Sequence, residues 1–193
     1  MSEGKASIRE VAEETARMNP TVTAEELMKD VEVDPDEPSQ ALGPLSWQGK
    51  RISELPGIIG DLTIKGDLYL NDNKLTSLPE GFWSLTVGEG LHLSNNGLVS
   101  LPEGIESLTV GCDLRLNDNK LASLPKGFGS LTIGGHLLLY YNKLASLPED
   151  FGSLSVIGSC NGHDGYVNLG NNPMAASVHT DSFPGLYLHL DDY

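Results

Sequence analysis

The sequence predicts a solenoid of the α/β class, in which short coils stack in a right-handed sense and their strands pair in parallel. The deciding observation is a repeat of 23 residues, visible in four hexapeptides that each begin with leucine and end with asparagine. They occupy residues 68–73, 91–96, 114–119 and 137–142. A unit of this size cannot bury its apolar side alone, so repeats with periods of about 20 to 50 residues stack on one another.

The repeat continues beyond these four copies in both directions. Leu45 and Trp47 fall in the columns of the paired leucines one period earlier, so a degenerate first coil begins near Leu45. A fifth copy at residues 167–172 arrives 30 residues after Leu137, because seven extra residues lie near 157–164. The sequence therefore predicts a repeat domain over residues 45–193, with about five coils, an insertion near 157–164 and a C-terminal capping coil.

The columns of similar residues predict a structural role for each position in the repeat. Leucines equivalent to Leu70, Leu75 and Leu85 recur from coil to coil and are expected to face inward. Burial of apolar surface, at about 25 cal/mol per Å², is then the main stabilising term. The asparagine that ends each hexapeptide is expected to join a hydrogen-bonded ladder, because an amide side chain both donates and accepts. The ladder comprises Asn73, Asn96, Asn119, Asn142 and Asn172.

The pattern Leu-x-Leu-x-x-Asn-x-Leu, followed by Ser-Leu-Pro-x-x-Phe-x-x-Leu, resembles the leucine-rich repeat family in its 23-residue intracellular type. The resemblance covers about residues 45 to 190, and it implies parallel strands along one face with irregular or short helical turns along the other. One position departs from the family pattern: the leucine expected three residues before the Leu-x-Leu pair is absent. Lys65, Gly88, Gly111 and Gly134 stand there, with Ile64, Val87, Val110 and Ile133 one residue earlier. The strand edges are therefore expected to be shifted.

Residues 1–44 are expected to form an acidic helical segment followed by a linker. Ser7 and Glu10 form the ends of a capping box that opens a helix through about Met18, and residues 23–26 form a second box that opens a helix through about Val31. Two roles remain open for this segment. It either caps the exposed end of the first coil or binds a partner, and we favour the cap because short amphipathic helices gain most of their stability from packing.

Charge and composition narrow the class of partner. The formal net charge of −15 disfavours nucleic acid and anionic membranes as partners and favours a protein, a basic one in particular. The sequence contains no apolar run of about 18 residues and no secretory signal pattern. Cys112 and Cys160 are the only cysteines, which favours a reducing compartment, and we expect a cytoplasmic protein.

Residues between the paired leucines are expected to point outward and to form a binding face. They change from coil to coil while the inward positions hardly do, and Tyr and Arg are enriched at the energetic centres of interfaces. The candidate protein-binding residues are Tyr69, His92, Arg115, Leu138, Tyr140 and Asn168. The alternative for each of them is an ordinary solvated surface. We therefore expect a non-catalytic protein-interaction module, an adaptor or scaffold, that uses the strand face.

The sequence leaves two other functions open and contains no motif for catalysis or metal binding. A structural subunit held through the N-terminal segment and the 157–164 insertion is the main alternative. An ice-binding solenoid is a remote one, suggested by the hydroxyl columns that contain Thr86 and Ser84. No catalytic motif is present, and the group Cys160, His163 and Asp164 has too few ligands for a closed zinc site. We expect no enzyme activity, cofactor or metal.

Overall fold

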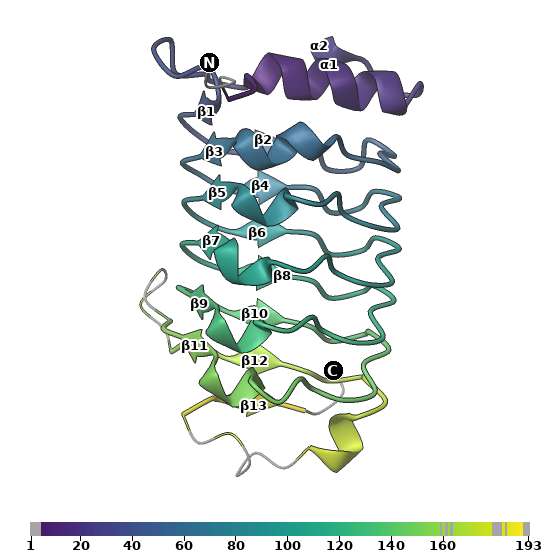
Figure 1. Cartoon of the computed structure of the whole chain (residues 1–193), viewed down its shortest axis with the longest axis vertical. Coiled ribbons are helices and arrows are strands. Elements are labelled where there is room, and N and C mark those ends of the chain that lie inside the picture. The colour runs from purple at the N-terminus through teal and green to yellow at the C-terminus, as the bar shows by residue number, and fades with distance from the viewer. Residues whose placement is uncertain are drawn as a thin grey trace.

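The computed structural model describes residues 5–158, 160, 162, 164–178, 183 and 185–190 of the 193-residue chain. Figure 1 shows a stack of coils with two helices lying across its N-terminal end. Most coils contain three elements in order, as in β3 (Thr63–Ile64), β4 (Leu68–Tyr69) and the 3-10 turn η2 (Phe82–Ser84). Because each element stacks on its counterpart in the next coil, the molecule has two sheets and one column of turns.

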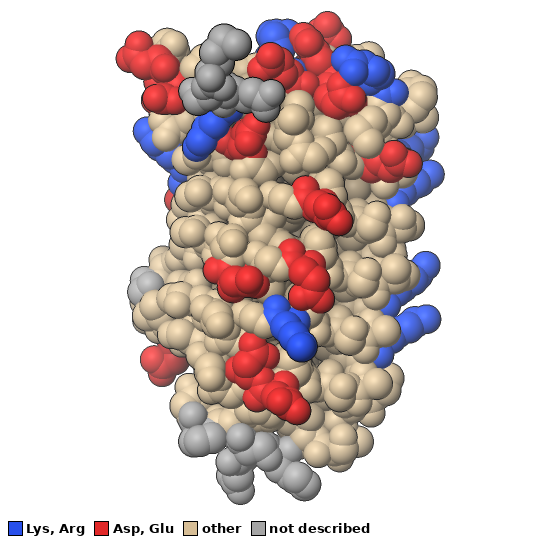
Figure 2. All heavy atoms as spheres, viewed as in Figure 1, with Lys and Arg blue, Asp and Glu red and all other residues tan. Residues whose placement is uncertain are grey.

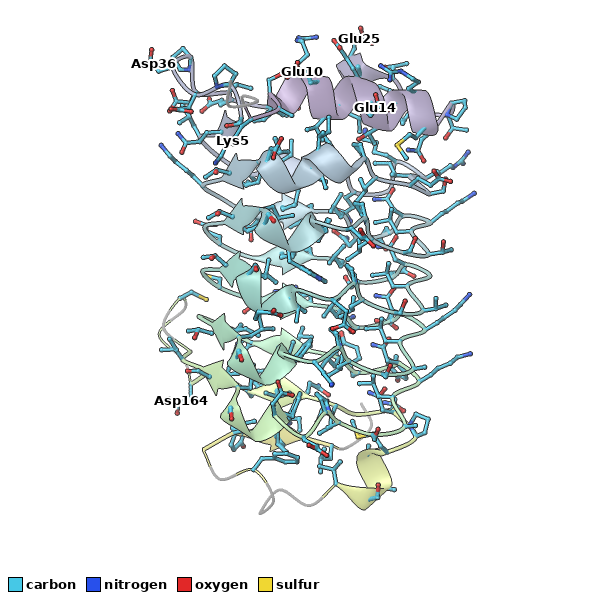
Figure 3. The ribbon with its side chains drawn as sticks, in the orientation of Figure 1. Lys5, Glu10, Glu14, Glu25, Asp36 and Asp164 are labelled. Atoms are coloured by element: carbon cyan, nitrogen blue, oxygen red, sulfur yellow. The ribbon has the colours of Figure 1, made fainter. Side chains whose placement is uncertain are left out.

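The N-terminal helices are α1 (Ile8–Met18) and α2 (Ala24–Leu27), and both begin with the capping boxes expected from the sequence. The helix α2 is shorter than predicted, because the chain leaves the helical conformation after Met28 and Asp30 adopts a φ of 60°. The apolar side chains of both helices are buried, among them Ile8 and Leu27 at 0% exposure. Figure 3 shows acidic side chains, including Glu10, Glu14 and Glu25, gathered at this end of the stack.

Side chains from the first coil fix the helices in place. The indole Nε1 of Trp47 donates a hydrogen bond to the Leu27 carbonyl at 2.9 Å. The amide of Asn19, just after α1, donates to the Glu54 carbonyl at 2.8 Å and accepts from the Ser53 N–H at 2.7 Å. The helices and the first coil thus share both an apolar contact and a polar one.

Seven short strands form the sheet that was expected along one face. In spatial order it runs β13-β12-β10-β8-β6-β4-β2, and every pairing is parallel. Leu45, Leu68, Leu91 and Leu114 pair in register, so the 23-residue period becomes a straight column. Besides β4, the strands are β2 (Leu45–Ser46), β6 (Leu91–His92), β8 (Leu114–Arg115), β10 (Leu137–Leu138), β12 (Val167–Asn168) and β13 (Leu188–His189).

A second parallel sheet was not expected, since the sequence placed strands on one face alone. Its order is β1-β3-β5-β7-β9-β11. Besides β3, its strands are β1 (Gln40–Ala41), β5 (Thr86–Val87), β7 (Thr109–Val110), β9 (Thr132–Ile133) and β11 (Ser155–Val156). Ile64 and Val87 point inward at 0% exposure and replace the leucine that the family pattern lacks here. β-Branched residues suit strands, so this substitution produces a sheet where a loop was expected.

Glycines allow the coils to approach one another closely beside the second sheet. A Cβ atom added to Gly111 would lie 1.9 Å from the Gly88 carbonyl oxygen, and one added to Gly134 would lie 1.8 Å from that of Gly111. Real Cβ contacts are never so short, so any other residue would push the backbones apart. The glycines that interrupt the expected leucine column are therefore required by the stacking distance.

Short turns close each coil on the side opposite the strands of the seven-stranded sheet. Besides η2, they are η1 (Gly57–Asp61), η3 (Ile105–Ser107), η4 (Phe128–Ser130), η5 (Phe151–Ser153) and η6 (Ala175–Ser177). Phe82, Ile105 and Phe128 begin three of these turns and are fully buried. Together with the leucines of the seven-stranded sheet they form one continuous core.

The asparagine column lies at the bend after each strand of the seven-stranded sheet and joins consecutive coils. The Asn119 amide donates to the Leu93 carbonyl of the preceding coil at 3.0 Å and to the Leu116 carbonyl of its own strand at 3.1 Å. Its oxygen accepts from the Leu98 N–H at 3.0 Å. The same three bonds recur at Asn73, Asn96, Asn142 and Asn172.

The insertion leaves and rejoins the stack at nearly one point. The Ile157 N–H donates to the Ile133 carbonyl just before it, and the Leu137 N–H donates to the Tyr166 carbonyl just after it. A Cβ on Gly165 would lie 2.8 Å from the Gly158 nitrogen, so the two ends of the insertion touch. Within the residues that the structure describes, no helix has the length and apolar character needed to cross a membrane.

Candidate protein-binding face

The outward side chains of the seven-stranded sheet form a surface that changes from coil to coil. Strand alternation sends the leucines of each Leu-x-Leu pair inward and the residue between them outward. We call the surface around Tyr69, His92, Arg115, Leu138 and Tyr140 the binding face. These five residues lie on or just after β4, β6, β8 and β10, so the parallel register places them in one row with a neighbouring position beside it.

Tyr69 and His92 are held together on adjacent strands by a shared carboxylate. Their rings stack with centroids 4.5 Å apart and an interplanar angle of 22°. The Tyr69 hydroxyl donates to Asp67 Oδ2 at 3.0 Å, and His92 Nε2 lies 3.1 Å from Asp67 Oδ1. That oxygen also accepts from the Gly90 N–H at 2.9 Å. Asp67 therefore orients both rings and ties its own coil to the next.

Burial and hydrogen bonding shift the pKa of each group in this cluster. Burial lowers the pKa of His92 below its ordinary value, although the Asp67 carboxylate opposes this effect. Burial would raise the pKa of Asp67, but hydrogen bonds from His92, Gly90 and Tyr69 together lower it. The pKa of Tyr69 is raised by burial and then by its hydrogen bond to Asp67. At neutral pH the cluster thus contains a neutral imidazole beside a carboxylate.

A second carboxylate, Asp113, has the same role at a distance of two coils along the stack. Its Oδ2 accepts from Arg115 Nη2 at 2.8 Å, and its Oδ1 accepts from the His136 N–H at 2.8 Å. The Arg115 side chain remains 43% exposed while that of Asp113 is 8% exposed. The guanidinium is therefore anchored at one edge and leaves donors available to solvent or to a partner.

Between the two carboxylates the surface is hollowed. The hollow has a volume of about 220 Å³ and is lined by Asp67, Tyr69, Gly90, His92, Cys112, Asp113 and Arg115. Gly90 is essential to its shape, because a Cβ there would lie 2.7 Å from both Asp67 Oδ1 and His92 Nε2. The hollow is polar, since two carboxylates, an imidazole and a guanidinium contribute to its lining.

Similarity to known proteins is found in the structure and not in the sequence. No family model matches the sequence, and no curated protein matches it. A chain of the Toll - Spatzle complex of Drosophila is similar at a TM-score of 0.55 and 22% identity, covering 77% of this chain and 21% of that one. The chain thus spans about a fifth of the length of that similar protein. The fold is that of a leucine-rich repeat solenoid.

Two bacterial leucine-rich repeat proteins are also similar, at lower TM-scores. YopM from Yersinia enterocolitica has a TM-score of 0.45 and 25% identity, covering 67% of this chain and 29% of that one. The leucine-rich repeat domain of a Shigella effector has a TM-score of 0.44 and 20% identity, covering 77% of this chain and 81% of that one. The leucine-rich repeat fold expected from the sequence is confirmed by the stacked parallel strands and by the similarity to the Toll chain.

Along the solenoid, the predicted contact residues differ in how accessible they are. Leu138 and Tyr140 are half-buried, and the Tyr140 ring packs edge-on against Tyr141, which is 44% exposed. Asn168 is the most buried of them at 1% exposure, followed by His92 at 9%, and the Asn168 Oδ1 accepts from the Gly170 N–H at 3.0 Å. That Asn168 contacts a partner stays a prediction, and in the structure its amide supports the chain after β12.

Sequence reasoning missed two aromatic residues that extend the solenoid's binding face. The Tyr166 ring lies 4.1 Å from the His136 ring, and the Tyr166 N–H donates to His136 Nδ1 at 3.3 Å. Tyr141 was overlooked because it has the position of Asp72 and Asp118, whose side chains point away from the core at a left-handed φ. Tyr166 immediately precedes β12, and its place in the column was obscured by the insertion.

Two buried amide oxygens beside this row have no hydrogen-bond partner among the described residues. They belong to Asn71 and Asn117, which lie two coils apart in the position next to the row. Each amide nitrogen is used, donating to Asp72 or Asp118 at 2.7 and 2.6 Å. A buried acceptor without a donor costs about 1–3 kcal/mol.

Basic residues recur at one position of the solenoid repeat. Figure 2 shows Lys and Arg side chains projecting along one edge of the stack. The exposed residues just after the asparagine ladder, one in most coils, are Arg51, Lys74, Lys120 and Lys143. Asp72 and Asp118 lie two residues before two of these lysines, so the row is interrupted by carboxylates. It is too short and too mixed in charge to indicate a nucleic-acid track.

Metal ligation finds no support in the described region of the solenoid. Among those residues, no group of three or more His, Cys, Asp or Glu side chains is placed to hold a metal ion. Of the group considered from the sequence, His163 lies outside the described residues, whereas Cys160 and Asp164 lie within them.

Proposed function

We propose that this leucine-rich repeat solenoid is a non-catalytic protein-recognition module, an adaptor or scaffold, that binds its partner through the binding face. The observation that carries the proposal is the fixed geometry of Tyr69, His92 and Arg115. Each of these side chains is held by a carboxylate before any partner arrives. Ordering of a rotamer-rich side chain costs about 0.5–1.5 kcal/mol on binding, so fixed aromatic and arginine side chains favour recognition.

The chemistry of the face suggests what kind of partner segment fits. Tyr69 and Tyr140 offer flat apolar surface with a polar tip, and the hollow beside Arg115 offers carboxylates for donors. An extended polypeptide carrying basic and apolar side chains would match these groups, and the net charge of −15 would steer it toward the surface.

Affinity capture from an extract of the source cells tests the proposal. The bait proteins are the wild-type chain, a face variant (Tyr69→Ala, Arg115→Ala, Tyr140→Ala) and a control variant on the other sheet and the turn beside it (Ser107→Ala, Thr109→Ala, Thr132→Ala). Each variant is first shown by circular dichroism to be folded. We expect one protein to be captured by the wild type and the control and lost by the face variant. Equal capture by all three would contradict the proposal.

The structural-subunit alternative places the contact on the N-terminal segment and the 157–164 insertion. The apolar side chains of α1, such as Val11 and Ala12, are buried beneath it. A partner would therefore meet only the charged outer side of the helices, where Glu13 and Glu25 are exposed. Equal capture by the wild type and the face variant, with loss of capture after Glu13→Lys and Glu25→Lys, would favour this alternative.

Ice binding remains the remote alternative, and one observation favours keeping it. Thr63, Thr86 and Thr109 pair in register on the outer side of the six-stranded sheet. A column of exposed serines runs beside them, namely Ser84, Ser107, Ser130 and Ser153. Two parallel hydroxyl columns on a flat surface are the minimum for matching a lattice. Thermal hysteresis of the purified protein tests this, and its absence at millimolar concentration would end the idea.

A further inference from the structure

The two cysteines are 48 positions apart in the sequence, yet the fold brings their thiols together. Cys112 precedes β8 in the third of the regular coils, and its thiol is hydrogen-bonded to that of Cys160 in the insertion. Neither forms a disulfide bond in this structure, and both are half-buried. The chain has no other thiol, so both of its thiols lie at this one contact.

The backbone around Cys112 is rigid, which fixes one side of the pair. The Cys112 N–H donates to the Glu89 carbonyl at 3.0 Å, and the Cys112 carbonyl accepts from the Gly135 N–H at 3.0 Å. These bonds continue the parallel stacking of the coils on both sides of Cys112. Its Cα position is therefore set by the solenoid itself.

Gly135 makes the room that Cys160 occupies. A Cβ on Gly135 would lie 2.9 Å from Cys160 Sγ and 3.0 Å from the Cys112 carbonyl carbon. Gly165, at the end of the insertion, also lies against Gly135, since a Cβ there would be 2.7 Å from its carbonyl oxygen. The insertion thus crosses the coil of Gly135 to reach Cys112, and Figure 1 shows the chain after β11 turning back toward β9.

We propose that Cys112 and Cys160 are a reversible oxidation site, which forms an intramolecular disulfide bond by exchange with a small-molecule disulfide. Formation of the bond would fasten the insertion to the regular coils, and reduction would release it. The inference concerns the insertion and stands whether or not the binding face recognises a protein.

The chemistry is ordinary thiol–disulfide exchange in two steps. Burial, and then the hydrogen bond to Cys160, raises the pKa of Cys112 to about 12, which disfavours the Cys112 thiolate, so Cys160 loses its proton and attacks first. It takes one half of the small disulfide RSSR and releases RS⁻. Cys112 then loses its proton and attacks the Cys160 sulfur, which expels the second RS⁻. Two protein thiols and one RSSR become one protein disulfide and two RSH.

Oxidised and reduced glutathione in varied ratio, applied to the full chain, test the proposal. After acid quenching and alkylation, mass spectrometry of the unreduced digest identifies the fate of each cysteine. We expect a linked pair of peptides containing Cys112 and Cys160 in monomeric protein. The Cys112→Ser variant should stop at a glutathione adduct on Cys160, and neither the Cys112→Ser nor the Cys160→Ser variant should form a linked peptide.

Thermal unfolding supplies a second readout that needs no variant. The bond would close a loop of two whole coils in the unfolded chain, so the oxidised protein should melt at least about 5 °C above the reduced one. The proposal is overturned if wild-type Cys160 accumulates a stable glutathione adduct without the link to Cys112. It is overturned equally if linked peptides occur only in covalent dimers.

Discussion

The outer side of the six-stranded sheet repeats one side chain from coil to coil, whereas the outer side of the seven-stranded sheet changes at every coil. Thr63, Thr86 and Thr109 stack in register on the first. Tyr69, His92 and Arg115 occupy the equivalent positions on the second, and each is bonded to a neighbouring carboxylate. The two sheets share the same coils, so the geometry of the solenoid cannot account for the difference.

This contrast separates residues that build the frame from residues placed on it. The glycines beside the six-stranded sheet and the asparagine ladder are explained by stacking, because each satisfies a requirement that recurs with the period. Nothing in the stacking requires a stacked Tyr69 and His92 or an anchored Arg115. Substitutions in the shared coils should therefore destabilise both sheets, whereas substitutions on one outer side should affect that side alone.

Removal of residues 1–43 should produce the largest effect, since both sheets begin beneath this segment. It deletes β1 from the six-stranded sheet and uncovers Leu45 and Trp47, both 0% exposed. We propose that the segment is a cap and expect the melting temperature to fall by about 10 °C or more, with loss of solubility. Glu13→Ala and Glu25→Ala, on the outer side, should change neither. An unchanged melting temperature after deletion would contradict the cap.

The asparagine ladder holds the bend between consecutive coils, on which both sheets depend. Asn119→Leu should therefore cause the next largest loss of stability. It leaves the Leu98 N–H without its partner and removes one of two amide donors from the Leu93 and Leu116 carbonyls, which keep those of Asn96 and Asn142. At about 1–3 kcal/mol for an unpaired buried group, the free energy of unfolding should fall by about 2 kcal/mol or more in urea titrations. Asn71→Leu, which removes a single bond to Asp72, is the matched control and should cost about 1 kcal/mol.

Gly111→Ala should damage the side of the six-stranded sheet while leaving the binding face folded. The new Cβ would lie 1.9 Å from the Gly88 carbonyl oxygen, and such overpacking costs about 1–3 kcal/mol. At Gly43, where nothing lies within 4 Å of an added Cβ, alanine should be neutral. Equal melting temperatures for the two variants would show that the coils do not stack as closely as described.

Acidification should lower the free energy of unfolding through the protonation of His92. This effect should be smaller than those above and should arise on the binding face. Because burial lowers the pKa of His92 in the folded state, the unfolded chain binds a proton more readily. The stability that His92 contributes is present above its ordinary value of about 6.5 and is lost as pH falls through the folded value. His92→Phe keeps an aromatic ring against Tyr69 without titrating, so its free energy of unfolding should fall less between pH 7.5 and pH 5.5.

Asp67 does not share this pH window. Its pKa is also lowered, so its contribution to stability is present above its ordinary value and is lost only at more acidic pH. An equal loss of stability in the wild type and in His92→Phe over pH 7.5 to 5.5 would show that the imidazole is not the group responsible.

The periodic region of this structure could be predicted from the sequence because one residue type at one position recurs in every coil. The leucine core, the ladder and the pairing register all depend on such recurrence. The second sheet was missed because the sequence there was compared with a leucine pattern. Ile64 and Val87 perform the same inward role one residue earlier, and strands of two residues are too short to show alternation.

The site was harder to predict because it depends on contacts that do not recur. Outward direction alone could not separate Arg115, which is anchored and accessible, from Asn168, which is buried by its neighbourhood near the insertion. The pairing of Cys112 with Cys160 depends on the path of seven inserted residues, and neither residue is unusual in its own segment. Information about these contacts resides in the tertiary structure.

The most direct test of recognition by the seven-stranded sheet places a photo-crosslinking residue, p-benzoylphenylalanine, at one position on each sheet. Leu138 is half-buried on the outer side of β10, and Thr132 is exposed on the outer side of β9 in the same coil. Irradiation in an extract of the source cells should link a protein to position 138 and none to position 132. The same protein linked from both positions, or from position 132 alone, would contradict recognition by the seven-stranded sheet.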